Sequence, residues 1–108
     1  MLVENLKKAD IDISSSGDNT IIAAPTNGYI AIDMINFIVS AAVGVQLKDG
    51  ATNYGGAYSF DANQAMVLEN ASYHQKGVIT ITPGQAFVIN LDGAVQVSGF
   101  VRYRIVGE

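Results

Sequence analysis

The 108-residue sequence contains no cysteine and no tryptophan, and it has only one histidine and two prolines. Without cysteine the chain can form neither disulfide bonds nor zinc–thiolate sites, and it has no thiol nucleophile. The single histidine, His74, makes a histidine-rich metal site or a Ser-His-Asp triad a poor candidate. We therefore expect a protein that is not an enzyme and that uses no metal or other cofactor.

Charged residues are also scarce, at 15% of the chain compared with about 25% in typical globular proteins. The net charge of −4 argues against a nucleic-acid-binding domain, which normally presents a basic face. No apolar run approaches the roughly 20 residues that span a bilayer, and the first ten residues lack the long apolar segment of a signal peptide. We expect synthesis in the cytoplasm, no membrane or nucleic-acid partner, and a neutral surface suited to being covered by other proteins.

Valine, isoleucine and threonine are abundant, alternate with polar residues, and are separated by glycine-rich turns. This pattern is typical of short β-strands. The expected strands cover residues 9–13, 20–24, 29–40, 43–48, 58–60, 66–68, 78–82, 85–91 and 94–106. About eight short strands at nearly regular spacing predict an all-β, single-domain antiparallel β-sandwich of the jelly-roll kind over residues 10–108, preceded by a flexible N-terminal arm of residues 1–9.

Three local patterns refine this prediction. Residues 29–40 carry apolar side chains on both faces, which predicts a central strand that is covered on both sides. Asp92-Gly93 stands between two alternating runs and predicts a hairpin turn. Arg102 and Arg104 share one face of the last strand, where they either pair with carboxylates of a neighbouring strand or subunit or lie exposed.

Few side chains suggest chemistry. Asp10 and Asp12 place two carboxylates on one strand face, a set that suits a cation such as calcium, although a solvated strand face is the commoner role. Tyr54, Tyr58 and Tyr73 lie in or near expected loops. Exposed tyrosines can stack on sugar rings, but they more often pack in a core or an interface.

Four stretches of the sequence, taken in their order along the chain, are more specific than its composition. They are SGDNTIIAA (16–24), AVGVQLKDGATN (42–53), PGQAFVINL (83–91) and GAVQVSGFVRY (93–103). In this order they resemble a family of short proteins encoded near the head genes of tailed bacteriophages. That family looks like small β-sandwich virion components, often assigned as head decoration (capsid cement) proteins. The chain departs from the family pattern between residues 63 and 77, where members often have a Gly-Gly and a loop ending in Gly-Trp.

The resemblance implies a function by adhesion, and it brings no catalytic residue with it. Many copies would bind the assembled phage head, with the major capsid protein as partner, and would stabilise the shell on its outer surface. The localisation implied is the virion. A homo-oligomer is also implied, and a trimer is the form expected from decoration proteins as a class.

Position and composition suggest where the partner is contacted. The expected contacts are the arm residues Leu2, Val3 and Leu6 and the loop residues Tyr73, His74 and Gln75. Two other functions remain open from the sequence. One is a tail, neck or fibre-base component of a phage, and the other is a carbohydrate-binding β-sandwich module that uses the three tyrosines.

Overall fold

The computed structural model describes residues 6–70 and 76–107, and within these ranges the protein is all-β. The strands are β1 (Lys7–Ile13), β2 (Gly17–Ile22), β3 (Tyr29–Val39), β4 (Val43–Asp49), β5 (Thr52–Asn53), β6 (Tyr58–Phe60), β7 (Ala65–Glu69), β8 (Ile79–Thr80), β9 (Phe87–Leu91) and β10 (Val97–Val106). Two of these, β5 and β8, have only two residues each; β8 lies within the strand expected at residues 78–82, whereas β5 was not predicted.

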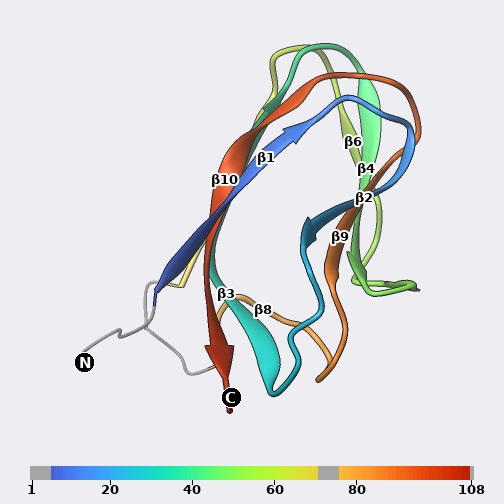
Figure 1. The fold of residues 1–108 in the computed structure, drawn as a ribbon. Helices are drawn as coiled ribbons and strands as arrows, with labels where there is room; N and C mark the ends of the chain where they lie inside the picture. The colour runs from blue at the N-terminus through green and yellow to red at the C-terminus, as the bar shows by residue number, and fades with distance from the viewer. Residues whose placement is uncertain (1–5, 71–75, 108) are drawn as a thin grey trace.

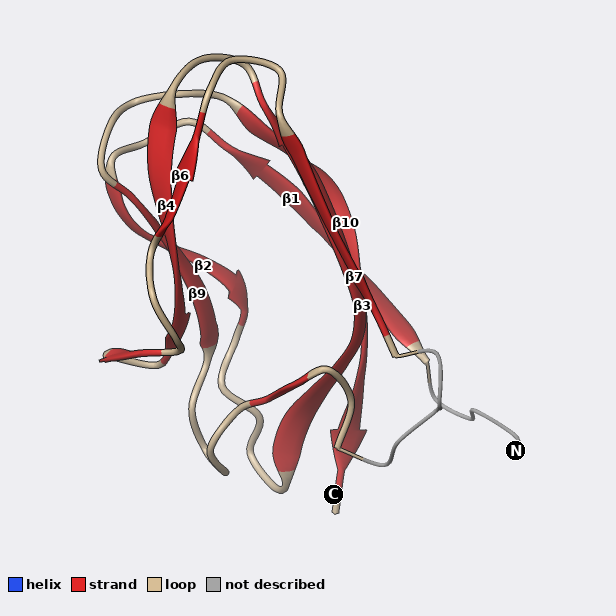
Figure 2. Cartoon of the chain, turned by 180° about the vertical axis from the view of Figure 1, so that it is seen from behind, coloured by secondary structure: helices blue, strands red, loops and turns tan. Residues whose placement is uncertain are grey.

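The strands form two antiparallel sheets that pack face to face (Figure 1). Sheet A has the order β1-β10-β3-β7, with β8 also pairing with β3. Sheet B has the order β2-β9-β4-β5, with β6 also pairing with β4. The chain passes from one sheet to the other at each of its first three connections, from β1 to β4, and again between β6 and β7, β8 and β9, and β9 and β10 (Figure 2). This order is that of a jelly roll, so the predicted fold class is confirmed.

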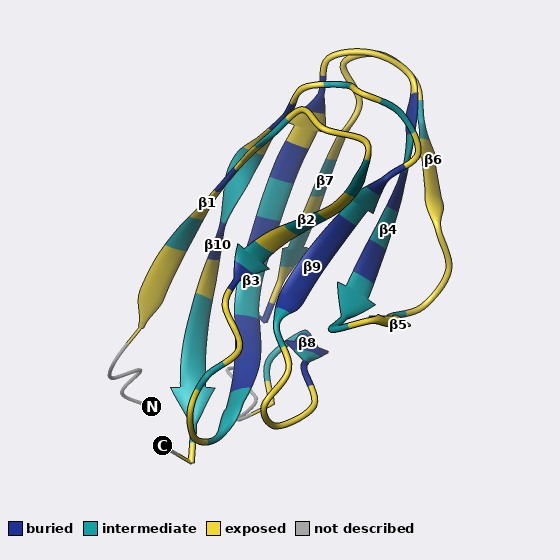
Figure 3. Cartoon of the chain, turned by 45° about the vertical axis from the view of Figure 1, so that its right-hand side comes forward, coloured by how far each residue is buried: buried dark blue, intermediate teal, exposed yellow. Residues whose placement is uncertain are grey.

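The core lies between the inner faces of the sheets, and burial follows the alternation of the strands (Figure 3). In β4, Val43, Val45 and Leu47 are buried while the residues between them are not. In β9, Phe87, Ile89 and Leu91 lie on one face of the strand and are almost fully buried. The inward side chains of both sheets form one continuous apolar cluster.

Strand β3 is central in sheet A, but it contains an irregularity at Asp33. Met34 lies opposite Arg102 of β10 and Ile32 lies opposite Tyr103, so Asp33 is an extra residue without a partner on β10. Such a β-bulge changes which side chains point inward on either side of it. The core-facing residues are Ile30 and Ile32 before the bulge and Ile35, Phe37 and Val39 after it.

This bulge corrects one prediction. The sequence pattern suggested that β3 is covered on both faces, yet Ile38 on the outer face is 46% exposed. Apolar residues occur at both even and odd positions of β3 because the bulge turns the even-numbered residues before it and the odd-numbered residues after it toward the same core. Within the described residues, the outer face of β3 has no second layer over it.

The start of the first strand and the turn at Asp92-Gly93 also differ from the predictions. The expected arm of residues 1–9 is too long, because β1 begins at Lys7 and Lys7 pairs with Tyr103. Polar side chains are normal on an edge strand, so the alternation pattern did not indicate where β1 begins.

Asp92-Gly93 does not form the predicted hairpin turn, since β9 and β10 belong to different sheets. The Asp92 carboxylate instead accepts a hydrogen bond from the backbone N–H of Gly44 at 2.7 Å and holds the crossing in place.

Candidate functional site

The structure describes one of the six residues predicted to contact a partner. Leu6 precedes β1 directly and is 41% exposed. The other five, Leu2, Val3, Tyr73, His74 and Gln75, lie outside the described residues. The structure therefore locates only the described residues that lie next to these five in the sequence.

These neighbours lie at one end of sheet A. Lys8, near the start of β1, pairs with Arg102 of β10. Arg102 pairs on its other side with Met34 of β3, and Met34 pairs with Glu69 at the end of β7. The four residues form one row across the sheet. The two segments that were predicted separately to contact a partner, before β1 and after β7, thus adjoin the same end of the sandwich. We call it the arm end.

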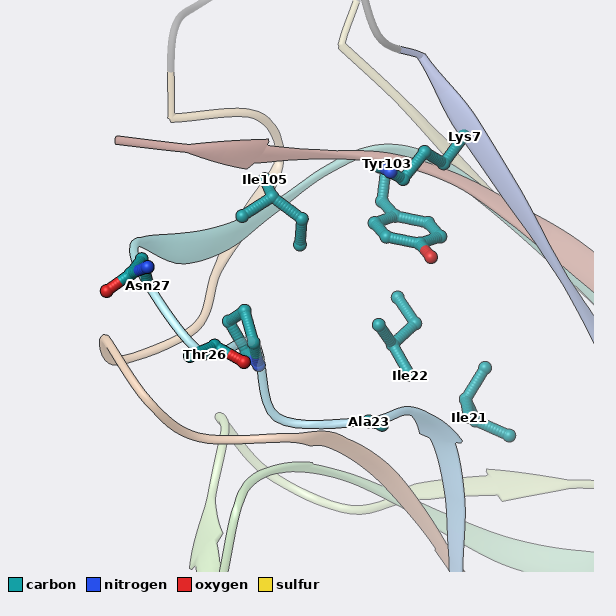
Figure 4. A pocket seen from close by; sticks show the side chains of 9 residues that line it. Lys7, Ile21, Ile22, Ala23, Thr26, Asn27, Tyr103 and Ile105 are labelled. Carbon is teal, nitrogen blue, oxygen red and sulfur yellow. The ribbon is translucent and has the colours of Figure 1, made fainter. Parts of the chain in front are cut away.

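A pocket of about 350 Å³ opens at the arm end between β10 and the segment that leads from β2 to β3. Tyr103 and Ile105 of β10 point into it from one side, and Ile22 of β2 points toward Tyr103 from the other (Figure 4). Ile22 is turned inward after a second irregularity, because Ile21 is an extra residue in the pairing of β2 with β9.

The lining of this pocket combines apolar and polar groups. Isoleucine side chains and the Tyr103 ring provide the apolar part, while Lys7, Thr26 and Asn27 add polar groups. A concave site of this kind suits an apolar side chain that is flanked by a hydrogen-bond acceptor or a carboxylate. Lys7 follows Leu6 directly, so the pocket lies beside the one described residue of the predicted contact set.

An ion pair fixes the other side of the arm end. Arg104 donates to both carboxylate oxygens of Asp33, at 2.6 and 2.9 Å, and both side chains are largely buried. Asn70, directly after β7, donates its side-chain amide to Asp33 at 3.0 Å, and its backbone N–H donates to the Asp33 carbonyl at 2.7 Å. Burial raises the pKa of Asp33, but the hydrogen bonds from Arg104 and Asn70 outweigh it, so the pKa is lowered overall.

Gly77 brings the chain back to sheet A after the loop. Its φ of 70° lies in the left-handed region, and a Cβ here would collide with the backbone of Ile32. Val78 then donates its N–H to the Ile32 carbonyl at 2.8 Å. Asn70 and Gly77 therefore hold both described ends of the predicted contact loop against β3.

The two sheets present different outer faces. On sheet B, Asp18 accepts hydrogen bonds from Asn90 at 2.7 Å and from Lys48 at 3.1 Å, and these bonds lower the pKa of Asp18. On sheet A, the outer face near β7 carries Ile38 and Val67, which are 46% and 64% exposed. The outer face of sheet B thus carries a polar network of Asp18, Lys48 and Asn90, whereas part of the outer face of sheet A exposes aliphatic side chains.

The remaining candidates from the sequence are engaged by the chain itself. Asp10 pairs with Lys8 at 3.1 Å, and Asp12 accepts a hydrogen bond from Gln96 at 2.8 Å. Among the described residues, no group of three or more histidine, cysteine or acidic side chains is placed to hold a metal ion. Of the two described tyrosines proposed to stack on sugars, Tyr54 packs against the core and Tyr58 is 41% exposed. The described chain contains no helix of the length and apolarity that a membrane span requires.

Arg102 and Arg104 have separate roles although they share a strand face. Arg104 pairs with Asp33 of the neighbouring strand, while the Arg102 guanidinium lies 5.8 Å from the centre of the Phe100 ring. Asp33 and the residues that line the pocket were not among the residues predicted from the sequence. The available signal for Asp33 was a single charged residue within a long apolar strand.

Comparison with known proteins gave no match to this chain among protein families, curated proteins or solved structures. The resemblance to phage head proteins therefore depends on the four sequence stretches alone.

Proposed function

We propose that this protein is a non-enzymatic structural component of a phage particle, a decoration protein that binds the assembled head. One observation carries the proposal beyond the sequence resemblance. The two segments predicted to contact a partner both adjoin the arm end, beside a pocket lined with apolar and polar groups. The arm end is then the surface that faces the shell, with the major capsid protein as partner.

The mechanism is stabilisation by selective binding. A protein that binds the assembled lattice but not the separated subunits stabilises the lattice by mass action. Repetition over the shell, and self-association of the chain into an oligomer, would convert weak individual contacts into avidity. In this mechanism the pocket receives an apolar side chain of the capsid protein, and Lys7 pairs with an acceptor next to it.

The first test is the copy number of the chain in purified particles of its source virus, measured by quantitative mass spectrometry. We expect a number comparable to that of the major capsid protein. A handful of copies would replace the head assignment with a tail, neck or fibre-base position. Absence from the particles would overturn the proposal and direct attention to glycan binding, tested with Tyr58→Ala.

A second test locates the binding surface with two matched variants. Leu6→Asp adds a negative charge at the arm end, and Ser15→Asp adds one at an exposed position between β1 and β2, at the other end of the sandwich. Binding to heads that lack the protein should weaken with the first variant and stay unchanged with the second. Equal behaviour of the two variants would contradict the assignment of the arm end. A truncation for the same purpose should stop before Lys7, since a longer one removes part of β1.

A further inference from the structure

Strand β7 is an edge strand with a free side. It pairs with β3, and no other strand of the described chain pairs with it. The backbone N–H of Val39 donates to the carbonyl of Gln64 at 3.0 Å, and the backbone N–H of Asn70 donates to the carbonyl of Asp33 at 2.7 Å. Because backbone groups alternate in direction along a strand, the even-numbered residues of β7 bond to β3. The N–H and C=O groups of Ala65, Val67 and Glu69 therefore point away from sheet A.

The side chains of these three residues lie on the outer face of the sheet. Val67 is 64% exposed, and Ala65 lies opposite Ile38, which is itself 46% exposed. A shallow groove of about 260 Å³ lies over this region, lined by Asn36, Phe37 and Ile38 of β3, by Ala65, Met66 and Val67 of β7, and by Ser98. An edge that combines free backbone groups with exposed aliphatic side chains is a template for adding another strand.

We propose that this edge is occupied by the same edge of a second copy of the chain. The two β7 strands would pair antiparallel about a two-fold axis that passes beside Val67. Each Val67 would then form a hydrogen-bonded pair with Val67 of the other copy, and Ala65 would pair with Glu69. The two copies of sheet A would become one continuous sheet.

Charge favours this occupant. Glu69 is the only charged residue of β7, and the two-fold pairing places it opposite Ala65, so no like charges meet. The other free edge of sheet A, β1, would bring Asp10 and Asp12 against Val67 and its aliphatic neighbours. A two-fold contact also closes on itself, whereas pairing β7 with β1 would continue from copy to copy. The proposal concerns self-association and does not depend on the proposed function.

Single cysteine variants test the register directly, because the chain has no cysteine of its own. Residues in a hydrogen-bonded antiparallel pair have Cα atoms about 5.5 Å apart, which a disulfide bond can bridge. Val67→Cys should therefore form a disulfide-linked dimer under mild oxidation. Ala65→Cys is the matched control, since the two cysteines would lie about 13 Å apart along the paired strands and should remain unlinked.

Sedimentation velocity provides a second measurement. We expect a concentration-dependent dimer, weakened about tenfold or more by Val67→Lys, which places like charges opposite each other. Thr20→Lys adds the same charge at an exposed position of sheet B and should leave the dimer intact. Circular dichroism of each variant confirms that the monomer is folded. A protein that stays monomeric at all concentrations, a trimer, or equal cross-linking of the two cysteine variants would overturn the proposal.

Discussion

The two free edges of sheet A belong to the same sheet but differ in chemistry. Four of the seven residues of β1 are charged, and its outer face presents Lys8, Asp10 and Asp12. Only one of the five residues of β7 is charged, and its outer face presents Val67 at 64% exposure. Two rows of the outer face run from an aspartate of β1 to an aliphatic residue of β7, from Asp10 to Val67 and from Asp12 to Ala65, whereas the row that starts at Lys8 ends at Glu69.

Charges on an edge strand oppose pairing with another chain, because pairing would bring them together or remove them from water. By this criterion β1 is protected and β7 is not. We interpret this contrast as a division of function between the two edges. The β1 side holds the pocket and the residues next to the predicted arm, while the β7 side is the edge proposed to pair with another strand. Four predictions test how far this division holds.

The largest effect is expected from the core beneath β7. Phe37 is 2% exposed, lies opposite Met66 of β7, and its ring centre is 5.5 Å from that of Phe60 in β6. Phe37→Ala should lower the free energy of unfolding by about 3–5 kcal/mol, because it removes a large buried side chain and leaves a cavity. The measurement is urea denaturation.

The control for this prediction lies on the outer face next to β1. Phe100 pairs with Asp10 and is only partly buried. Phe100→Ala should cost about 1 kcal/mol, since much less apolar area returns to water. Equal losses for the two variants would show that the outer face contributes to stability as much as the core does.

The next largest effect concerns ion pairs. Asp33→Asn removes the carboxylate that pairs with Arg104, and we expect a loss of about 2–3 kcal/mol. Asp10→Asn removes the partner of Lys8 at an exposed site of β1 and should cost at most about 1 kcal/mol. Chemical denaturation at neutral pH compares the two, and a larger loss for Asp10→Asn would contradict the assignment.

The Asp33 pair also predicts a dependence on pH. The pKa of Asp33 in the folded protein is lowered from 3.8, so the folded state favours the ionised carboxylate. Its contribution to stability is present above pH 3.8 and is lost as the pH falls through the lowered pKa. A series of denaturation curves from pH 5 downward should therefore show a smaller acid-induced loss in Asp33→Asn than in the natural protein.

A third prediction converts one edge into the other. Replacing Lys8, Asp10 and Asp12 together by threonine removes the charges from the outer face of β1 and should change the stability of the monomer by about 1 kcal/mol or less. It should introduce a new self-association through β1. Sedimentation velocity in the Val67→Lys background isolates this contact, and an unchanged monomer there would mean that charge is not what protects β1.

The smallest effect is expected at Arg102, whose guanidinium lies over the Phe100 ring. Arg102→Gln should cost about 0.5–1 kcal/mol, the usual size of an exposed cation–π contact. Arg104→Gln, two residues further along the same strand face, should cost clearly more because it disrupts the pair with Asp33. Thermal denaturation of the two variants resolves the difference.

The sequence predicted those features that depend on neighbours along the chain. Alternation of apolar and other residues predicted the strand at residues 43–48, and Val43, Val45 and Leu47 prove to be its buried face, because side chains of a strand alternate whatever the strand pairs with. The same alternation predicted the strand at residues 94–106, in which Val97 and Val101 are buried. The fold class follows from the number and spacing of such strands.

Features that depend on distant pairing were not predicted. The bulge at Asp33 exists only in the register between β3 and β10, and no local pattern contains that register. Asp92-Gly93 has the composition of a turn, but composition does not indicate which sheet the chain enters next. For the candidate site, the sequence identified Leu6 but not the pocket beside it, which is formed by β1, β2, β10 and the segment after β2.

The pairing of β1 with β10 has a consequence for the order in which the protein folds. The first strand of the described chain has its only sheet partner in the last one, and β10 also separates β1 from β3. Sheet A is therefore incomplete until β10 has left the ribosome, and loop closure over the span from β1 to β10 makes folding slow compared with that of helical proteins. A nascent chain that ends before Val97 leaves β1 without its sheet partner and one edge of β3 unpaired, so the interval before β10 emerges is when this protein is most exposed to aggregation.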